Sequence, residues 1–172
     1  THNKGKLKEI AYLISKKFKK ISPLSLNIKS PKETGKSFIS NSKLKVNFFS
    51  KYVDYPVISD DSGLRIEALN NKPGVYSARL AKKHGSFHKA MKFILKKMKQ
   101  KKNRKATLVC SLSYKNDYGK IISVEGRLKG NIANKILGKR GFGYDAIFIP
   151  IKKKLLLVKC PNQKKLKWII DI

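Results

Sequence analysis

Residues 55–64 read YPVISDDSGL, a short apolar run followed by two adjacent carboxylates, a serine and a glycine. Tyr55 to Ser59 has the length and composition of a buried strand, and Leu64 to Leu69 continues as a second extended piece. The whole chain has only ten Asp and Glu residues, so two neighbouring aspartates at a strand end are unusual. Because neighbouring side chains on a strand point to opposite faces, we expect only one of Asp60 and Asp61 to face a pocket.

Helical and extended patterns alternate along the rest of the chain. The spacing of apolar residues predicts helices over Lys6 to Lys19, Ser37 to Tyr52 and Phe87 to Lys101. Further strands are predicted over Ile21 to Ile28, Lys105 to Tyr114, Lys120 to Arg127 and Ala146 to Ile149, with a turn at 115–119 that makes a hairpin. The 172 residues, 41% of them hydrophobic, suffice for one globular domain. We therefore expect an α/β or α+β domain built on a mixed sheet, and of the two we favour α/β.

The chain is strongly basic, with a formal net charge of +31. Such a charge can attract a nucleic-acid backbone, so a non-catalytic nucleic-acid-binding module is one alternative function. Lysine, isoleucine and asparagine have A/T-rich codons, however, and only five of the 41 basic residues are arginines. The lysine runs also lack interleaved aromatic residues on which bases could stack. We therefore favour a bias of genome composition and do not expect nucleic acid as the partner.

Nothing in the sequence indicates a membrane or an oxidising compartment. No run reaches the roughly 18 apolar residues of a membrane span. The start has no signal-peptide pattern, and Cys110 and Cys160 have no metal-ligand spacing. We expect a cytoplasmic protein.

Three motifs carry groups that suit a nucleotide, although each alone also has an ordinary structural explanation. The opening residues 1–6, THNKGK, precede a helix and supply backbone amides, a hydroxyl and two ammonium groups for a phosphate chain. The same residues could be an N-cap followed by solvated lysines. A carboxylate of Asp60-Asp61 could hold Mg²⁺ and orient or deprotonate a water, or the pair could lie in a capped turn.

The third motif is GFGYD at 141–145. An aromatic ring can stack on a purine, and glycine lets backbone groups approach the base edge. A glycine-rich turn with core aromatics is the alternative.

Taken together and in this order, the motifs resemble the inosine triphosphate pyrophosphatase family. The resemblance covers about 150 residues. It is carried by Thr1-x-Asn3-x-x-Lys6, Glu33-Thr34-Gly35-x-Ser37-Phe38-x-x-Asn41-x-x-x-Lys45, Asp60-Asp61-Ser62-Gly63-Leu64, Pro73-Gly74-Val75-Tyr76-Ser77-Ala78-Arg79 and Gly141-Phe142-Gly143-Tyr144-Asp145. Five ordered blocks are far more specific than any one of them.

The resemblance implies an elongated central mixed sheet flanked by helices, with two lobes, a nucleotide cleft between them, a homodimer and Mg²⁺. It implies hydrolysis of non-canonical purine nucleoside triphosphates such as ITP, dITP and XTP to the monophosphate and pyrophosphate. The preferred base stays open, and a relative that acts on other modified nucleotides is a further alternative.

The resemblance also implies roles for individual residues. Asp61 would be the catalytic proton acceptor and a metal ligand, with Asp60 and Glu33 as further metal ligands. Arg79 and Lys45 are weaker candidates. The substrate-binding residues would be Thr1, His2, Asn3, Lys4, Gly5 and Lys6 for the triphosphate, Ser62 for the substrate, and Phe142, Gly143, Tyr144 and Asp145 for the base.

Both ends depart from the family pattern. Family members have a short apolar strand before the first motif, whereas this sequence starts on Thr1. We expect residues 1–150 to form the pyrophosphatase domain and 151–172 to be an atypical lysine-rich tail without the family's base-reading His-Arg pair. Our hypothesis is a frameshift at Lys152 to Lys154, which resequencing of the locus would test. An inactive fragment of the family is therefore another alternative.

Overall fold

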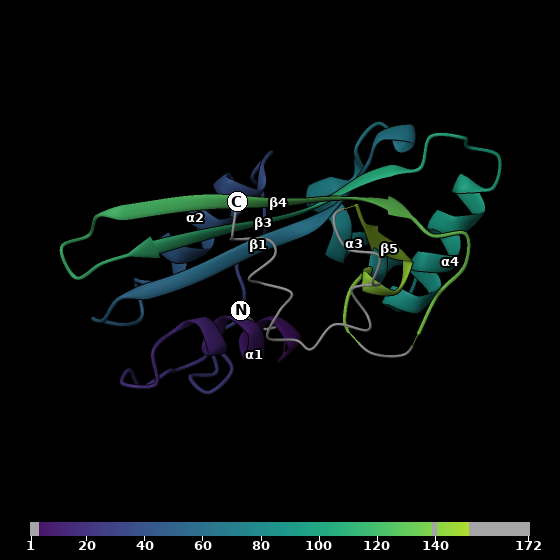
Figure 1. Cartoon of the computed structure of the whole chain (residues 1–172). Helices are drawn as coiled ribbons and strands as arrows, with labels where there is room; N and C mark the ends of the chain where they lie inside the picture. Colours follow the sequence, from purple (N-terminus) through teal and green to yellow (C-terminus); the bar gives the residue numbers. More distant parts are fainter. Residues whose placement is uncertain (1–3, 139–140, 152–172) are drawn as a thin grey trace. The chain divides into compact units, whose positions relative to one another are not determined.

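A five-stranded sheet runs through the computed structural model, which describes residues 4–138 and 141–151 (Figure 1). The strand order is β2-β1-β3-β4-β5, and the β1–β2 and β4–β5 pairs are antiparallel. Figure 1 shows β1, β3 and β4 as long ribbons lying side by side. The expected α/β class is confirmed. The strands are β1 Val57–Ile66, β2 Lys72–Pro73, β3 Lys105–Lys115, β4 Ile121–Ile132 and β5 Phe148–Pro150; the α-helices are α1 Lys4–Leu13, α2 Phe38–Phe49, α3 Ser77–Lys83 and α4 Phe87–Met98.

The chain divides into two compact units, and each of the three long strands contributes residues to both. The described part of the first unit comprises residues 4–61 and 110–125. The described part of the second comprises 62–109, 126–138 and 141–151.

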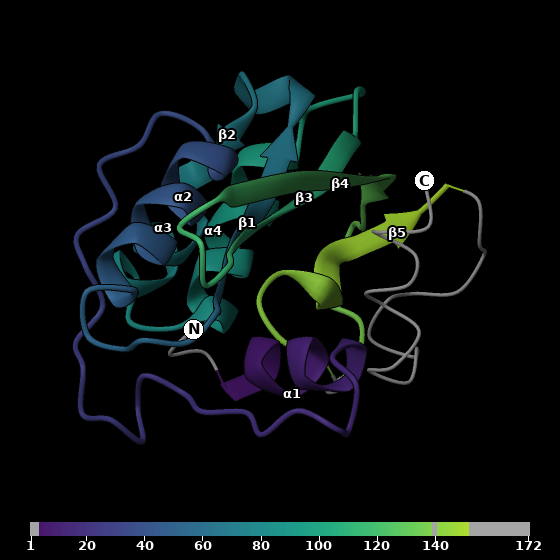
Figure 2. The ribbon, with the colours of Figure 1, turned by 90° about the vertical axis from the view of Figure 1, so that its left-hand side faces the viewer.

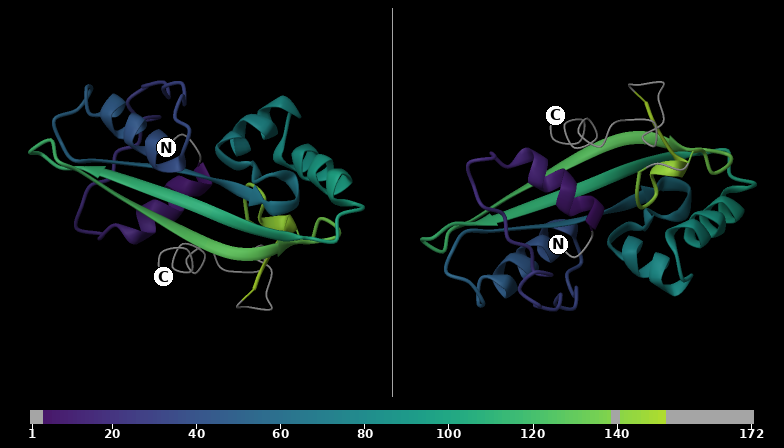
Figure 3. Two further views of the ribbon diagram at one scale, coloured as in Figure 1. Left: turned by 90° about the horizontal axis from the view of Figure 1, so that it is seen from above. Right: turned by 90° about the horizontal axis from the view of Figure 1, so that it is seen from below.

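In the first unit, α2 lies along one side of the long strands (Figures 2 and 3). Ser37 begins this helix with a capping box, in which its side chain accepts from Ser40 N–H and the Ser40 hydroxyl accepts from Ser37 N–H. Phe38 and Val46 are fully buried on the helix. Hydroxyl contacts join α2 to two strands, since Ser59 Oγ donates to the Ser42 carbonyl and the Ser42 hydroxyl bonds to that of Ser113.

The second unit has an apolar core. Helices α3 and α4 lie against each other and appear together in Figure 3. The apolar stripe of α4 recurs at helical spacing and is buried, while lysines occupy the other face. The fully or almost fully buried large side chains of this core are Leu64, Ile66, Ile94, Met98, Ile132, Ile147 and Phe148.

No helix within the described residues is long and apolar enough to cross a membrane.

The predicted helices over 37–52 and 87–101 and the hairpin over 105–127 are confirmed. The predicted strand over 21–28 is wrong, because these residues form turns in which Ser25 N–H donates to the Ser22 carbonyl and Ile28 N–H to the Pro23 carbonyl. Asn27 has a positive φ of 55° there. Serine, proline and asparagine favour turns, and this local chemistry outweighs the alternating apolar pattern.

Three other features of the fold differ from the prediction. Helix α1 ends at Leu13 rather than Lys19. The extended pieces predicted over 55–59 and 64–69 join in one strand, β1, so Asp60 and Asp61 lie inside a strand and not at its end. The strand stops at Ile66, and Glu67–Leu69 form a 3-10 helix instead of a strand. The short helix α3 was not predicted.

Candidate active site

The first carboxylate of the site, Asp60, forms a buried ion pair with Lys6 from the first turns of α1. Lys6 Nζ lies 2.7 Å from Asp60 Oδ2, and the side chains are 19% and 3% exposed. Burial alone would raise the pKa of Asp60, but the charges of Lys6 and Lys45 hold it below its usual value. Burial would likewise lower the pKa of Lys6, and the Asp60 carboxylate raises it above its usual value instead. Both groups therefore keep their charges inside the unit.

The second carboxylate, Asp61, faces α2 instead. Asn41 Nδ2 donates to Asp61 Oδ2 over 2.9 Å, and Lys45 Nζ lies 3.6 Å from Asp61 Oδ1. Asn41 and Lys45 are four residues apart, so they share one face of the helix. The two adjacent aspartates thus bind partners from different helices, as expected from the alternation of side chains along a strand.

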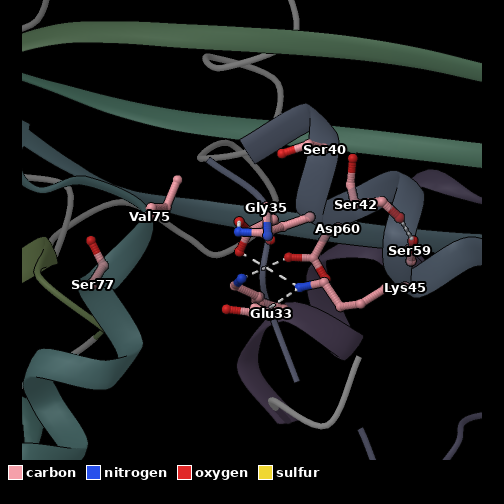
Figure 4. A network of polar contacts seen from close by, with 12 residues as sticks. Glu33, Gly35, Ser40, Ser42, Lys45, Ser59, Asp60, Val75 and Ser77 are labelled. Carbon is pink, nitrogen blue, oxygen red and sulfur yellow. Dashed lines mark hydrogen bonds and ion pairs between the residues drawn. The ribbon is translucent and has the colours of Figure 1, made fainter. Parts of the chain in front are cut away.

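Glu33 completes the cluster from the loop that precedes α2. Lys45 Nζ donates to Glu33 Oε1 over 2.8 Å, so one ammonium group lies between the carboxylates of Glu33 and Asp61. Figure 4 shows Glu33, Gly35, Lys45 and Asp60 gathered in this network.

The environment of Asp61 raises its pKa above the usual value. Burial is the main cause, Lys45 opposes it, and the negative charge of Glu33 adds to it. A carboxylate whose pKa is raised is a better proton acceptor for an attacking water. Asp61 is therefore the carboxylate of this cluster best suited to general-base chemistry.

A divalent metal fits this cluster only with outside ligands. Mg²⁺ takes oxygen ligands and is commonly held by one or two carboxylates together with water and substrate phosphates. Glu33 and Asp61 already share a cation, the Lys45 ammonium, whereas Asp60 binds Lys6. In residues 4–138 and 141–151, no three His, Cys, Asp or Glu side chains form a group that could hold a metal by itself. The donor set thus suits Mg²⁺ that arrives with a phosphate chain.

The predicted base-binding residues lie in the second unit, in a tight turn. Gly141 and Gly143 have positive φ angles of 84° and 64°, which glycine adopts without strain. Asp145 Oδ2 accepts from Phe142 N–H over 3.0 Å and fixes the turn. Phe142 is half-buried, whereas Tyr144 is 4% exposed. Of the two rings, Phe142 has more surface left for a ligand.

Tyr144 is anchored by its hydroxyl and its ring. The hydroxyl donates to the Ser77 carbonyl over 2.8 Å, and the ring packs edge-on against Phe87 with centroids 5.3 Å apart. Ser77 Oγ in turn accepts from Leu64 N–H and donates to the Gly74 carbonyl. The Ser77 hydroxyl thus ties β1 to the start of α3, a role that sequence analysis did not assign.

The remaining predicted residues are less informative. Thr1, His2 and Asn3 lie outside the described residues, whereas Lys4 and Gly5 begin α1. Ser62 is half-buried in β1 and belongs to the second unit. The weaker candidate Arg79 stacks over the exposed Tyr76 ring at 4.2 Å and donates to the Val75 carbonyl.

Two residues of the cluster have closer contacts than the sequence predicts. The sequence gives Lys45 only as a weaker candidate and assigns no role to Asn41, yet both contact Asp61. The signal that could have identified them is their spacing of four on the helix predicted from Ser37, four residues after Glu33.

Comparison with known proteins gives one consistent result. A model of the Ham1 family matches residues 1–168. The dITP/XTP pyrophosphatase of Zymomonas mobilis is 38% identical over 153 residues, which are 87% of this chain and 73% of that protein. The protein of the same name from Borreliella burgdorferi is 40% identical over 166 residues, 91% of this chain and 81% of that protein.

Solved structures agree with the sequence relatives. A HAM1 protein from Coxiella burnetii has a TM-score of 0.84 and 29% identity, and the match covers 98% of this chain and 88% of that one. The Ham1 protein of Staphylococcus aureus has a TM-score of 0.84 and 31% identity, with coverage of 99% and 92%.

The sheet with its helices thus defines an α/β protein with the fold of the solved Ham1 structures. The chain belongs to the Ham1 family. The resemblance deduced from the five sequence motifs is confirmed.

Proposed function

We propose that this chain hydrolyses non-canonical purine nucleoside triphosphates, such as ITP, dITP and XTP, to the monophosphate and pyrophosphate. The observation that carries the proposal is the buried cluster in which Lys45 lies between Glu33 and Asp61 while Lys6 pairs with Asp60. Relatives that cover most of this chain bear the name dITP/XTP pyrophosphatase. The cluster supplies the groups that such a hydrolysis needs, namely a base and cations for phosphate.

Each residue of the cluster has a defined part in this reaction. Lys6, with the backbone amides at the start of α1, binds the phosphate chain, and Asp60 keeps that ammonium charged. Asp61, assisted by its raised pKa, accepts a proton as water attacks one phosphorus of the α–β linkage. The bond from that phosphorus to the bridging oxygen breaks, and the monophosphate and pyrophosphate separate. Lys45 adds positive charge where negative charge develops.

We further propose that Glu33 and Asp61 hold Mg²⁺ together with water and substrate oxygens. Asp60, which is paired with Lys6, is a further carboxylate that supports the metal. When bound, Mg²⁺ would offset negative charge on the phosphates. Thr1, His2, Asn3, Lys4 and Gly5 complete the phosphate site, Ser62 contacts the substrate, and Phe142 to Asp145 contact the base.

We propose that the chain forms a homodimer and that it is located in the cytoplasm. Apolar side chains exposed on the first unit support a dimer, since Ile122 and Val124 of β4 are 52% and 55% exposed and Tyr114 of β3 is 37% exposed. Sedimentation equilibrium of the purified chain would test the dimer, and a monomer at all concentrations would rule it out.

The decisive experiment measures pyrophosphate release from ITP by the wild-type chain and by Asp61→Asn, with and without Mg²⁺. We expect Mg²⁺-dependent release that falls by about 10²–10⁴-fold in the variant, the usual contribution of a general base. The matched control is Asp54→Asn, which removes an exposed carboxylate of the same unit and should leave the rate unchanged.

Two results would contradict the proposal. A folded wild-type chain that releases no pyrophosphate would be an inactive member of the family. Binding to single-stranded nucleic acid that weakens steeply with salt and is the same in Asp61→Asn would favour the nucleic-acid-binding alternative. Comparing ITP and XTP with ATP, GTP and modified pyrimidine triphosphates would define the base preference.

A further inference from the structure

Asn41 uses both ends of its side-chain amide inside the first unit. It is fully buried, with no exposed surface. Its Nδ2 donates to Asp61 Oδ2 over 2.9 Å, and its Oδ1 accepts from Gly35 N–H over 2.8 Å. A buried amide is costly unless its hydrogen bonds are made, and here one group bridges a strand and a loop.

These two contacts orient the proposed general base. With Oδ2 engaged by Asn41, Oδ1 is the oxygen of Asp61 that lies toward Lys45, at 3.6 Å from its Nζ. The contact with Gly35 also fixes the loop that carries Glu33 two residues earlier. A single side chain therefore sets the positions of both carboxylates that flank Lys45.

The close approach of the loop is specific to glycine. A Cβ added at Gly35 would lie 2.5 Å from Asn41 Oδ1 and 2.9 Å from the Asn41 backbone nitrogen. Van der Waals contacts between such atoms do not occur at these separations, so no larger residue fits without moving the loop. The loop and the amide are thus matched to each other.

We propose that Asn41 is a positioning residue, whose amide holds the Asp61 carboxylate and the Glu33 loop in the arrangement required for hydrolysis. The inference rests on the proposed pyrophosphatase function. Only an amide of this size donates to a carboxylate at one end and accepts a backbone N–H at the other. Aspartate would keep the acceptor for Gly35 but would place a second carboxylate against Asp61.

Three variants separate positioning from plain structural support. Asn41→Asp keeps the size and the acceptor for Gly35 N–H, and it replaces the amide donor to Asp61 with a second carboxyl group. Asn41→Ala removes both contacts. The matched control is Ser42→Ala, since Ser42 is equally buried on the same helix and bonds to Ser113 and the Ile39 carbonyl rather than to Asp61.

The first readout is the split between kcat and KM for pyrophosphate release from ITP. In Asn41→Asp and Asn41→Ala we expect kcat to fall about 100-fold, the usual effect of a misplaced reacting group. KM should change by less than about threefold, since the phosphate-binding Lys6 is untouched. Ser42→Ala should keep the wild-type kcat even if its Tm falls as far as the Tm of the Asn41 variants. If Ser42→Ala loses as much kcat as Asn41→Asp, the proposal is overturned.

The second readout needs no activity. Hydrogen exchange at the Gly35 amide should be slow in the wild-type chain, Asn41→Asp and Ser42→Ala, and at least about tenfold faster in Asn41→Ala, where the acceptor is gone. Equal exchange in all four proteins would overturn the proposed contact. If the Gly35 amide is protected but the folded wild-type chain releases no pyrophosphate, the proposed function fails and the catalytic role of Asn41 fails with it.

Discussion

The interiors of the two units are built from different side chains. Among residues 4–138 and 141–151, seven of the nine buried polar or charged residues belong to the first unit, namely Asn41, Ser42, Ser59, Asp60, Asp61, Ser111 and Ser113. The other two in this part of the chain, Ser77 and Asp145, belong to the second unit, which has a large apolar cluster. Buried apolar surface stabilises a fold, whereas buried charge stabilises it little. The first unit therefore contains the charged groups that we propose for hydrolysis, and the apolar core of the second supplies a larger share of stability.

The largest effect is expected from breaking the buried ion pair of the first unit. Lys6→Met should lower the free energy of unfolding by about 3–5 kcal/mol, because it leaves Asp60 charged and without its cation. Urea denaturation measures the loss. The double variant Lys6→Met/Asp60→Asn should recover part of it, and a loss below about 1 kcal/mol would mean that the pair is solvated like a surface pair.

A cavity in the second unit should reduce stability without changing the chemistry. Ile94→Ala is expected to cost about 3 kcal/mol, since Ile94 is 1% exposed in the apolar core. At a temperature where the variant stays folded, its kcat should equal that of the wild type. The exposed Lys92 on the same helix is the control, because Lys92→Ala should shift stability by less than about 0.5 kcal/mol. A large fall in kcat of folded Ile94→Ala would show that the units do not divide these roles.

A smaller effect is expected at the loop that meets α2. Gly35→Ala should cost about 1–3 kcal/mol, because the added methyl group overlaps Asn41 and the loop has to move. Thermal unfolding and pyrophosphate release should both report the change, since Glu33 lies on this loop. Lys36→Ala at the exposed neighbouring position is the control, and an unchanged Gly35→Ala would show that the loop is free to shift.

Local features of this molecule can be predicted from the sequence, whereas contacts between distant residues cannot. The helix after Ser37 and the hairpin were predictable, because a cap and an apolar period are encoded in neighbouring residues. The prediction of a strand over 21–28 is wrong, because the turn-forming residues there outweigh the alternating apolar pattern. The motif predicts a catalytic role for Asp61, but it does not predict the contacts of Asp61 with Asn41 and Lys45. The distance from Asn41 to Asp61 depends on how helix and strand pack, and no local pattern specifies it.

The smallest expected effect is a gain in stability when Asp61, the proposed catalytic carboxylate of the first unit, is neutralised. The pKa of Asp61 is raised in the folded chain, so ionisation costs more in the native state than in the unfolded one. That cost is present above the native pKa and disappears as the pH falls to the unfolded value of about 4. Asp61→Asn should therefore unfold at a higher urea concentration than the wild type at pH 7, and this difference should shrink toward pH 4.

Asp60 has a lowered pKa, so its ionisation stabilises the native state above pH 4, and Asp60→Asn should change stability in the opposite direction at pH 7. If both variants shift stability in the same direction, the two adjacent carboxylates do not have the distinct environments that their different partners in the first unit predict.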